Sequence, residues 1–153
     1  MKTINQIETV LFTGKTHTMA SRRNGAPRTD GRLDIVLSLP GKEAADSGYT
    51  FAAVEAHPTA EQLFAGAWSA CYSAALGLVA MQKKVKLPPD LAVDLEVDVG
   101  KTGDAYLLQA RINVSAPGLA RDVAEEIVHG AHEICPYSKA TRGNIDVALN
   151  VVT

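Results

Sequence analysis

One long uncharged segment limits what this chain can fold into more than any other feature. Residues 63–81 carry no charge and are apolar or small on every face of a helix. A soluble helix of that kind must be buried all round, so the rest of the fold has to cover it. The helix is expected to begin near Thr59, because Thr59 and Gln62 have the spacing of a capping box, and to run to about Lys84.

The length of the chain limits how much of that helix one copy can cover. The 153 residues fit a single domain, residues 1–153, which buries about two thirds of the surface that its unfolded chain exposes. A domain of this size can hardly cover a helix that is apolar all round. A second copy that packs through Ala and Gly contacts along the helix would complete the cover, so we expect a homodimer.

The charge balance and the N-terminus argue against several classes of protein. The 15 basic and 17 acidic residues are mixed along the chain and leave a formal charge of -2, which gives no footprint for nucleic acid or an anionic membrane. Residues 1–8 lack the unbroken apolar core of a signal peptide, and no stretch is expected to approach the roughly 20 apolar residues of a membrane span. We therefore expect a cytoplasmic protein.

The N-terminal half predicts two strands before the long helix. Residues 10–12 and 33–39 are β-favouring runs, separated by a polar stretch at residues 21–31 that is rich in Arg, Gly and Pro. Residues 41–58 are small, polar and weakly patterned, so they are interpreted as a long connection.

The C-terminal half predicts a hairpin, a helix and a last strand. Apolar and polar residues alternate over 91–99, and a turn at 100–104 leads into a second strand at 106–114. Residues 119–134 indicate a helix, and 145–152 a final alternating strand. The apolar face of that helix is predicted at Val123, Ile127, Ala131 and Ile134. The order β-β-α-β-β-α-β indicates an α+β domain in which antiparallel sheets cover helices.

Two cysteines occupy different positions in this scheme. Cys71 lies in the middle of the apolar helix, roughly 18 Å past its start, which is too far for the helix dipole to stabilise a thiolate. Burial by itself raises the pKa of a thiol, so a reactive Cys71 needs a cation from elsewhere in the fold. Cys135 ends the second predicted helix, directly before Pro136, and is expected near the surface.

The residues alone leave the role of these cysteines open. In a reducing compartment they are usually buried small hydrophobes, metal ligands or redox groups. A buried attacking thiol and a second thiol at a helix end suit a cycle in which peroxide forms a sulfenic acid that condenses with the second thiol. A metal site is the rival, because His129, His132 and Cys135 are spaced three apart and Cys71 could be a fourth ligand.

Three blocks of sequence resemble one protein family. They are residues 23–25 (RNG) with 30–34 (DGRLD), residues 61–71 (EQLFAGAWSAC), and residues 135–147 (CPYSKATRGNIDV). In these blocks the chain is similar to the organic hydroperoxide resistance (Ohr) proteins of the OsmC superfamily, and the last block is the most specific. The resemblance implies an OsmC-like α+β fold in an intertwined homodimer.

The resemblance also implies a reaction. Cys71 would attack the terminal oxygen of an alkyl or fatty-acid hydroperoxide, and the resulting sulfenic acid would form a disulfide with Cys135. Members of the family are typically recycled by dihydrolipoamide, free or on lipoylated proteins, and no bound cofactor is implied. The alternative is a peroxide-sensing or ligand-binding redox module that oxidises without turnover.

The family's catalytic arginine matches Arg23, and its partner glutamate matches Glu61. An arginine beside Cys71 would stabilise the thiolate, and Glu61 would hold the guanidinium through a bidentate pair. Glu61 and Cys71 are separated by a rise of roughly 15 Å along one regular helix, so they cannot touch. Either Arg23 bridges them by folding over a helix end, or one of the groups comes from a second subunit.

The surroundings of the cysteines suggest an apolar pocket for an alkyl chain. Trp68 is the best candidate, because it lies three residues before Cys71 on the same side of the predicted helix. Phe64 and Tyr137 are further candidates for the wall of that pocket. The absence of a Gly-x-Ser-x-Gly motif argues against a serine hydrolase.

Overall fold

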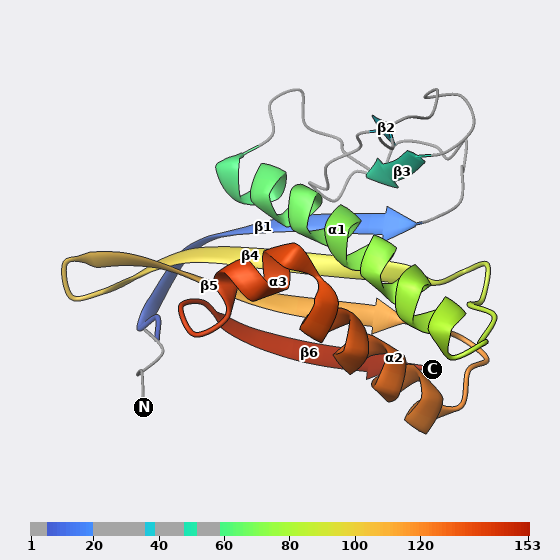
Figure 1. The fold of residues 1–153 in the computed structure, drawn as a ribbon. Coiled ribbons are helices and arrows are strands. Elements are labelled where there is room, and N and C mark those ends of the chain that lie inside the picture. Colours follow the sequence, from blue (N-terminus) through green and yellow to red (C-terminus); the bar gives the residue numbers. More distant parts are fainter. Residues whose placement is uncertain (1–5, 20–35, 39–47, 52–58) are drawn as a thin grey trace.

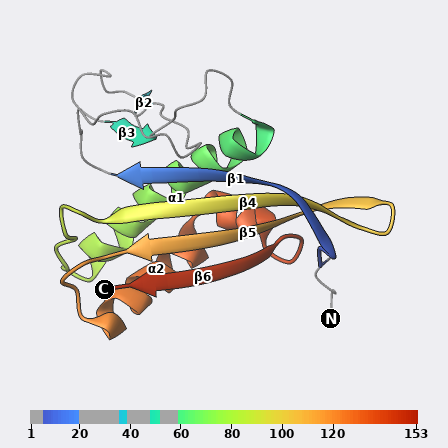
Figure 2. The ribbon, with the colours of Figure 1, turned by 180° about the vertical axis from the view of Figure 1, so that it is seen from behind.

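One mixed β-sheet with helices on a single face makes up the described part of the chain. The computed structural model describes residues 6–19, 36–38, 48–51 and 59–153. In chain order its elements are β1 (Thr9–Met19), β2 (Val36–Ser38), β3 (Gly48–Phe51), α1 (Ala60–Gln82), β4 (Ala92–Thr102), β5 (Ala105–Ser115), α2 (Arg121–Ile134), α3 (Pro136–Thr141) and β6 (Asp146–Val152). The strands form one sheet in the order β2-β3-β1-β4-β5-β6, with the helices on one face (Figure 1). Figure 2 shows the opposite face, over which none of the described helices passes.

The predicted α+β architecture is confirmed, with one correction to the sheet. Adjacent strands are antiparallel except for β5 and β6, which run parallel. A parallel pair needs a long crossover connection, and here α2 and α3 supply it. The expectation of purely antiparallel sheets is therefore wrong for β6.

Two short elements lie where none was predicted. Residues 41–58, interpreted as a connection, contain β3, which pairs with β1 and β2. Its four residues lie at the lower limit of the length over which alternation identifies a strand, and small, polar residues precede them. The second missed element is α3, which begins at Pro136, a residue whose fixed φ suits the first position of a helix. The predicted loop at residues 21–31 lies outside the described residues, and of the predicted strand at 33–39 the described part forms β2.

Strand β1 is much longer than the predicted strand at residues 10–12. Its inner face, towards α1, carries Gly14, Thr16 and Thr18, all of which are buried. Thr16 Oγ1 donates to a β4 carbonyl at 3.2 Å, and the hydroxyl oxygens of Thr18 and Ser69 are 2.6 Å apart. A search for alternating apolar residues misses this strand, because its buried positions are polar or lack a side chain.

Helix α1 follows the prediction closely and lies very near β1. Thr59 and Gln62 make both hydrogen bonds of the capping box, at 2.9 and 3.1 Å. At Gly14 the strand approaches so closely that an added Cβ would lie 2.6 Å from backbone atoms of Glu61 and Gln62. Only a residue without a side chain fits there, so Gly14 allows β1 and the first turn of α1 to meet.

The length and composition of α1 require a correction. Its 23 residues are long and apolar enough to cross a membrane, contrary to the expectation that no segment would be. The helix instead packs across β1 and β4 and against α2. This is how the core helix of a soluble fold is placed, and such a helix passes the same length and composition test.

One side of α1 is not covered by the described residues. Leu63, Leu78 and Met81 are 48%, 50% and 68% exposed. Together with two exposed alanines they form one line along the helix, which we call the α1 stripe: Leu63, Ala67, Ala74, Leu78 and Met81. The spacing of four, seven, four and three residues keeps these side chains on one side. Cys71 is half-buried and falls on the same line, four residues after Ala67.

The buried face of α2 is centred differently from the prediction. Ala124, Ile127, Val128 and Ala131 are buried against the core, whereas Ile134 is exposed. The prediction of core residues is therefore confirmed for Ile127 and Ala131 and is wrong for Ile134.

The outer face of the sheet carries a charged network centred on Asp98. Arg111 donates to both carboxylate oxygens of Asp98, at 2.6 and 2.9 Å, and Gln109 and Thr13 donate to the same group. Burial raises the pKa of Asp98, but these hydrogen bonds and the Arg111 charge outweigh it and lower the pKa to about 2. The network therefore ties β1, β4 and β5 together while Asp98 is ionised.

Replacement of Asp98 should make the free energy of unfolding less sensitive to a fall in pH. A carboxylate whose pKa is lowered on folding stabilises the protein above its unfolded pKa of about 4, and that stabilisation is lost as the pH falls through the folded pKa. The difference in free energy of unfolding between wild type and Asp98→Asn should thus be largest at pH 7 and shrink towards pH 2. Urea unfolding at several pH values measures it, and parallel curves over the whole range would contradict it.

Candidate active site

The two cysteines, far apart in the sequence, meet in the fold. The Sγ atoms of Cys71 and Cys135 are 3.2 Å apart, and both cysteines are free thiols. Cys71 comes from the middle of α1 and is half-buried. Cys135 is completely buried, so the expectation that it lies near the surface is wrong.

Cys135 is held at the junction of two helices. Its backbone N–H donates to the Ala131 carbonyl at 2.9 Å, in the last turn of α2, and its carbonyl accepts from Lys139 N–H at 3.0 Å, in the first turn of α3. Its ψ of 122° is extended, as expected for a residue before proline. Pro136 thus ends one helix, as predicted, and starts the next.

Two hydrogen bonds from α1 hold this pair of helices. Trp68 Nε1 donates to Ser138 Oγ of α3 at 3.0 Å, and the Tyr72 hydroxyl donates to the Val128 carbonyl of α2 at 2.7 Å. Trp68, Tyr72 and Ser138 are completely buried. The phenyl ring of Phe64 meets the Trp68 indole edge to face, with ring centroids 5.7 Å apart.

The described surroundings of Cys71 keep its thiol protonated. Burial is the largest effect and raises the pKa of Cys71, and the nearby Cys135 raises this pKa further. The backbone N–H of Tyr137 donates to the Cys71 sulfur and lowers the pKa, but the net result is about 11. An active thiolate therefore needs a positive charge beyond those that the described residues bring to Cys71.

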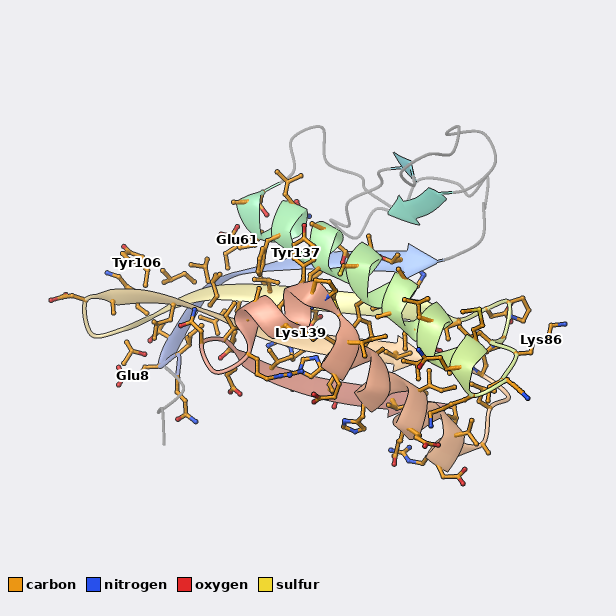
Figure 3. The ribbon with its side chains drawn as sticks, in the orientation of Figure 1. Glu8, Glu61, Lys86, Tyr106, Tyr137 and Lys139 are labelled. Carbon is orange, nitrogen blue, oxygen red and sulfur yellow. The ribbon has the colours of Figure 1, made fainter. Side chains whose placement is uncertain are left out.

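The predicted charged pair is only partly described. Glu61 lies in the first turn of α1 and is half-buried (Figure 3). Arg23 lies outside the described residues. The pairing of Arg23 with Glu61, and the contact of Arg23 with Cys71, therefore stay predictions.

The predicted pocket residues occupy three different environments. Trp68 is buried beneath α3, Phe64 is half-buried against the core, and Tyr137 is 42% exposed. Figure 3 shows Tyr137 on α3, beside the N-terminal half of α1. Tyr137 also supplies the backbone N–H that reaches Cys71. The role of these residues in binding an alkyl chain stays a prediction.

The described residues also bear on the alternative prediction of a metal site at His129, His132 and the two cysteines. Within the described part of the chain, no group of three or more His, Cys, Asp or Glu side chains could hold a metal ion. His132 is half-buried on α2, and its backbone carbonyl accepts from Arg142 at 2.9 Å.

Tyr72 and Ser138 lie beside the two cysteines but are not among the site residues that the sequence predicts. The signal for them was present, because Tyr72 is four residues after Trp68 and Ser138 lies in the block that begins at Cys135.

Comparisons with known proteins identify the family. A family model described as OsmC-like protein matches residues 53–150. An organic hydroperoxide resistance protein of Xanthomonas axonopodis pv. citri (strain 306) is 34% identical over 144 residues, which cover 94% of this chain and 96% of that protein. The organic hydroperoxide resistance protein OhrA of Bacillus subtilis (strain 168) is 33% identical, covering 92% and 96%.

A solved structure agrees with this match. The crystal structure of the organic hydroperoxide resistance protein OhrB of Bacillus subtilis has a TM-score of 0.59 at 33% identity and covers 88% of this chain and 95% of that chain. The chain therefore belongs to the OsmC-like protein family, in the organic hydroperoxide resistance (Ohr) branch. The names of these relatives support a role in resistance to organic hydroperoxides.

Mild oxidation should join the two cysteines within one chain. The Sγ atoms need to move closer only from 3.2 Å to the roughly 2.05 Å of a disulfide. One equivalent of diamide, a two-electron thiol oxidant, should therefore give a Cys71–Cys135 disulfide, detected by peptide mapping after free thiols are blocked. Cys135→Ser is the control, in which this link cannot form. If the wild type formed only disulfides between two chains and none within a chain, the geometry described here would be contradicted.

Proposed function

We propose that this protein is a cysteine-based peroxidase that reduces organic hydroperoxides to alcohols. The observation that carries the proposal is the contact of two free thiols at 3.2 Å, one half-buried and one completely buried. A thiol that is partly exposed can meet a substrate, and a thiol in contact with it can capture the oxidised sulfur before a second oxidation.

The proposed cycle has two steps on the protein. The thiolate of Cys71 attacks the terminal oxygen of the hydroperoxide, the O–O bond breaks, and the alkoxide leaves and takes up a proton as the alcohol. The sulfur loses two electrons and becomes a sulfenic acid. The Cys135 sulfur then attacks the Cys71 sulfur, the S–O bond breaks, and hydroxide leaves with the thiol proton as water. The product is the Cys71–Cys135 disulfide.

A dithiol such as dihydrolipoamide, free or on a lipoylated protein, is the proposed reductant. Its two thiols reduce the disulfide by exchange, so that the protein regains two thiols and the dithiol becomes a cyclic disulfide. No bound cofactor takes part in this scheme. The proposed place of action is the cytoplasm, where such reductants keep thiols reduced.

Arg23 and Glu61 are proposed to activate Cys71. The pKa of Cys71 is raised by burial in the described surroundings, so the thiolate needs a cation. Arg23 would supply that charge, and Glu61 would orient the guanidinium by a bidentate pair. A lysine would perform this task less well, because it has no planar fork of donors.

The surface around Cys71 favours an apolar substrate and a second copy of the chain. The α1 stripe is apolar along its whole length and contains the position of Cys71. An apolar surface of this kind is unfavourable in water, and a homodimer that packs through α1 would cover it. The part next to Cys71, with Phe64 and Tyr137, would then receive the alkyl chain of the hydroperoxide.

Steady-state turnover tests the activity. Wild type with dihydrolipoamide should consume tert-butyl hydroperoxide repeatedly and faster than hydrogen peroxide, because the apolar surface favours an alkyl group. Cys71→Ser should fall to the uncatalysed background, and Cys135→Ser should turn over more slowly than wild type, because dihydrolipoamide must then reduce the Cys71 sulfenic acid directly. Tyr106→Phe, on the far end of the β4–β5 hairpin (Figure 3), is the control and should keep full activity. A wild type that is oxidised once and stops would identify a sensor instead of an enzyme.

The pH dependence of alkylation tests the role of Arg23. A cation beside a thiolate lowers its pKa, so the rate of Cys71 alkylation by iodoacetamide should rise with a midpoint below the unperturbed value of roughly 8.5. Arg23→Met should move the midpoint upwards, towards the value set by burial. Arg22→Met is the matched control and should leave it unchanged. A wild-type midpoint at or above roughly 8.5 would contradict Arg23 as the activator.

A further inference from the structure

Two buried hydrogen bonds from α1 lie on either side of the Cys71–Cys135 contact. Their donors, Trp68 and Tyr72, are four residues apart and therefore lie on one side of the helix, three residues before and one residue after Cys71. Their acceptors, Ser138 Oγ and the Val128 carbonyl, lie after and before Cys135 in the chain. Each side of Cys135 is thus attached to α1 at a fixed point.

The donors have no alternative partner in water, because Trp68 and Tyr72 are completely buried. A buried N–H or O–H that loses its acceptor costs much more than one that can turn to solvent. The helix pair α2–α3 therefore cannot shift along or away from α1 without breaking at least one of these bonds. Both bonds have ordinary hydrogen-bond lengths, 3.0 and 2.7 Å, and each joins α1 to a different helix.

We propose that Trp68, Tyr72 and Ser138 are positioning residues that hold the Cys135 sulfur against the Cys71 sulfur and so set the ease of disulfide closure. The proposal rests on the proposed peroxidase function and concerns its second step. None of these three side chains needs to touch the substrate or the reacting atoms for this role. They act through the backbone of the segment from Val128 to Ser138, which carries Cys135 between its two attachment points.

The short distance that remains to be closed is the reason for a large effect. The Sγ atoms have to approach by only about 1 Å, and the rate of a reaction between held groups falls steeply when they are displaced by a similar amount. A shift of α3 would also move the Tyr137 N–H that donates to the Cys71 sulfur. Loss of either attachment should therefore weaken the disulfide more than it weakens the first reaction with peroxide.

Equilibrium with glutathione tests the proposal without relying on peroxidase activity. Oxidised glutathione takes two electrons from the two thiols, the Cys71–Cys135 disulfide forms, and two molecules of reduced glutathione are released. The proteins to be compared are wild type, Ser138→Ala, Tyr72→Phe and Trp68→Phe. Each is equilibrated over a range of ratios of reduced to oxidised glutathione. The fraction of protein with the Cys71–Cys135 disulfide is then measured by alkylation and mass spectrometry. Each variant should lower the equilibrium constant for closure about fivefold, the ratio that corresponds to one net hydrogen bond.

The matched control is another buried hydroxyl on α3. Among the described residues, Thr141 Oγ1 donates to two carbonyls of its own helix, those of Tyr137 and Ser138, both at 3.1 Å. Thr141→Val should lower the stability of the protein without changing the equilibrium constant for closure. A double variant, Trp68→Phe with Ser138→Ala, should lower that constant little more than either change alone, because both remove the same bond.

A kinetic measurement separates the two steps. After one equivalent of tert-butyl hydroperoxide, the lifetime of the Cys71 sulfenic acid, trapped with dimedone, should increase about fivefold in Ser138→Ala and Tyr72→Phe, in line with the loss of one hydrogen bond. The rate of its formation should stay within twofold of wild type. An unchanged closure constant in both variants, or a change no larger than that in Thr141→Val, would overturn the positioning role. Absence of turnover in the wild type together with weakened closure in the variants would reject the peroxidase and support the positioning role.

Discussion

The close approach of β1 to the first turn of α1 is the contact on which the placement of the site depends. Gly14 lets the strand reach the backbone of Glu61 and Gln62, and the capping box with Thr59 defines where the helix starts. Because an α-helix rises by a constant amount per residue, the position of Cys71 along the helix axis is then determined. The position of the sulfur is thus decided by backbone contacts about three turns away from it.

The burial that positions Cys71 also opposes its chemistry. The desolvation that comes with packing α1 into the core raises the pKa of Cys71, and one backbone N–H from Tyr137 does not offset it. In the proposed mechanism the two tasks are therefore divided. The helices hold the sulfur atoms in place, and Arg23, from the segment that follows β1 in the chain, supplies the charge.

Long, regular elements could be predicted from the sequence, whereas the polar inner face of β1 and the burial of Cys135 could not. The capping box and the apolar run identify α1, and alternation identifies the β4–β5 hairpin. The inner face of β1 is hidden because it consists of glycine and hydrogen-bonded threonines. The burial of Cys135 could not be foreseen from its position at a helix end, since that end packs against α1 in the fold. The contact between two cysteines 64 residues apart was predicted from the family resemblance, because their spacing in the sequence alone does not predict it.

The unequal exposure of the two cysteines gives the proposed cycle a direction. Cys135 is completely buried, and its backbone is hydrogen-bonded on both sides, so a reductant cannot reach its sulfur without opening the α2–α3 junction. Cys71 is half-buried and lies on the line of the α1 stripe, on the side of α1 that the described residues leave uncovered. A dithiol that reduces the disulfide must therefore attack the Cys71 sulfur as a thiolate, and Cys135 leaves as a thiolate that takes up a proton. The same exposed sulfur then meets both the peroxide and the reductant, while the buried one only exchanges with its neighbour.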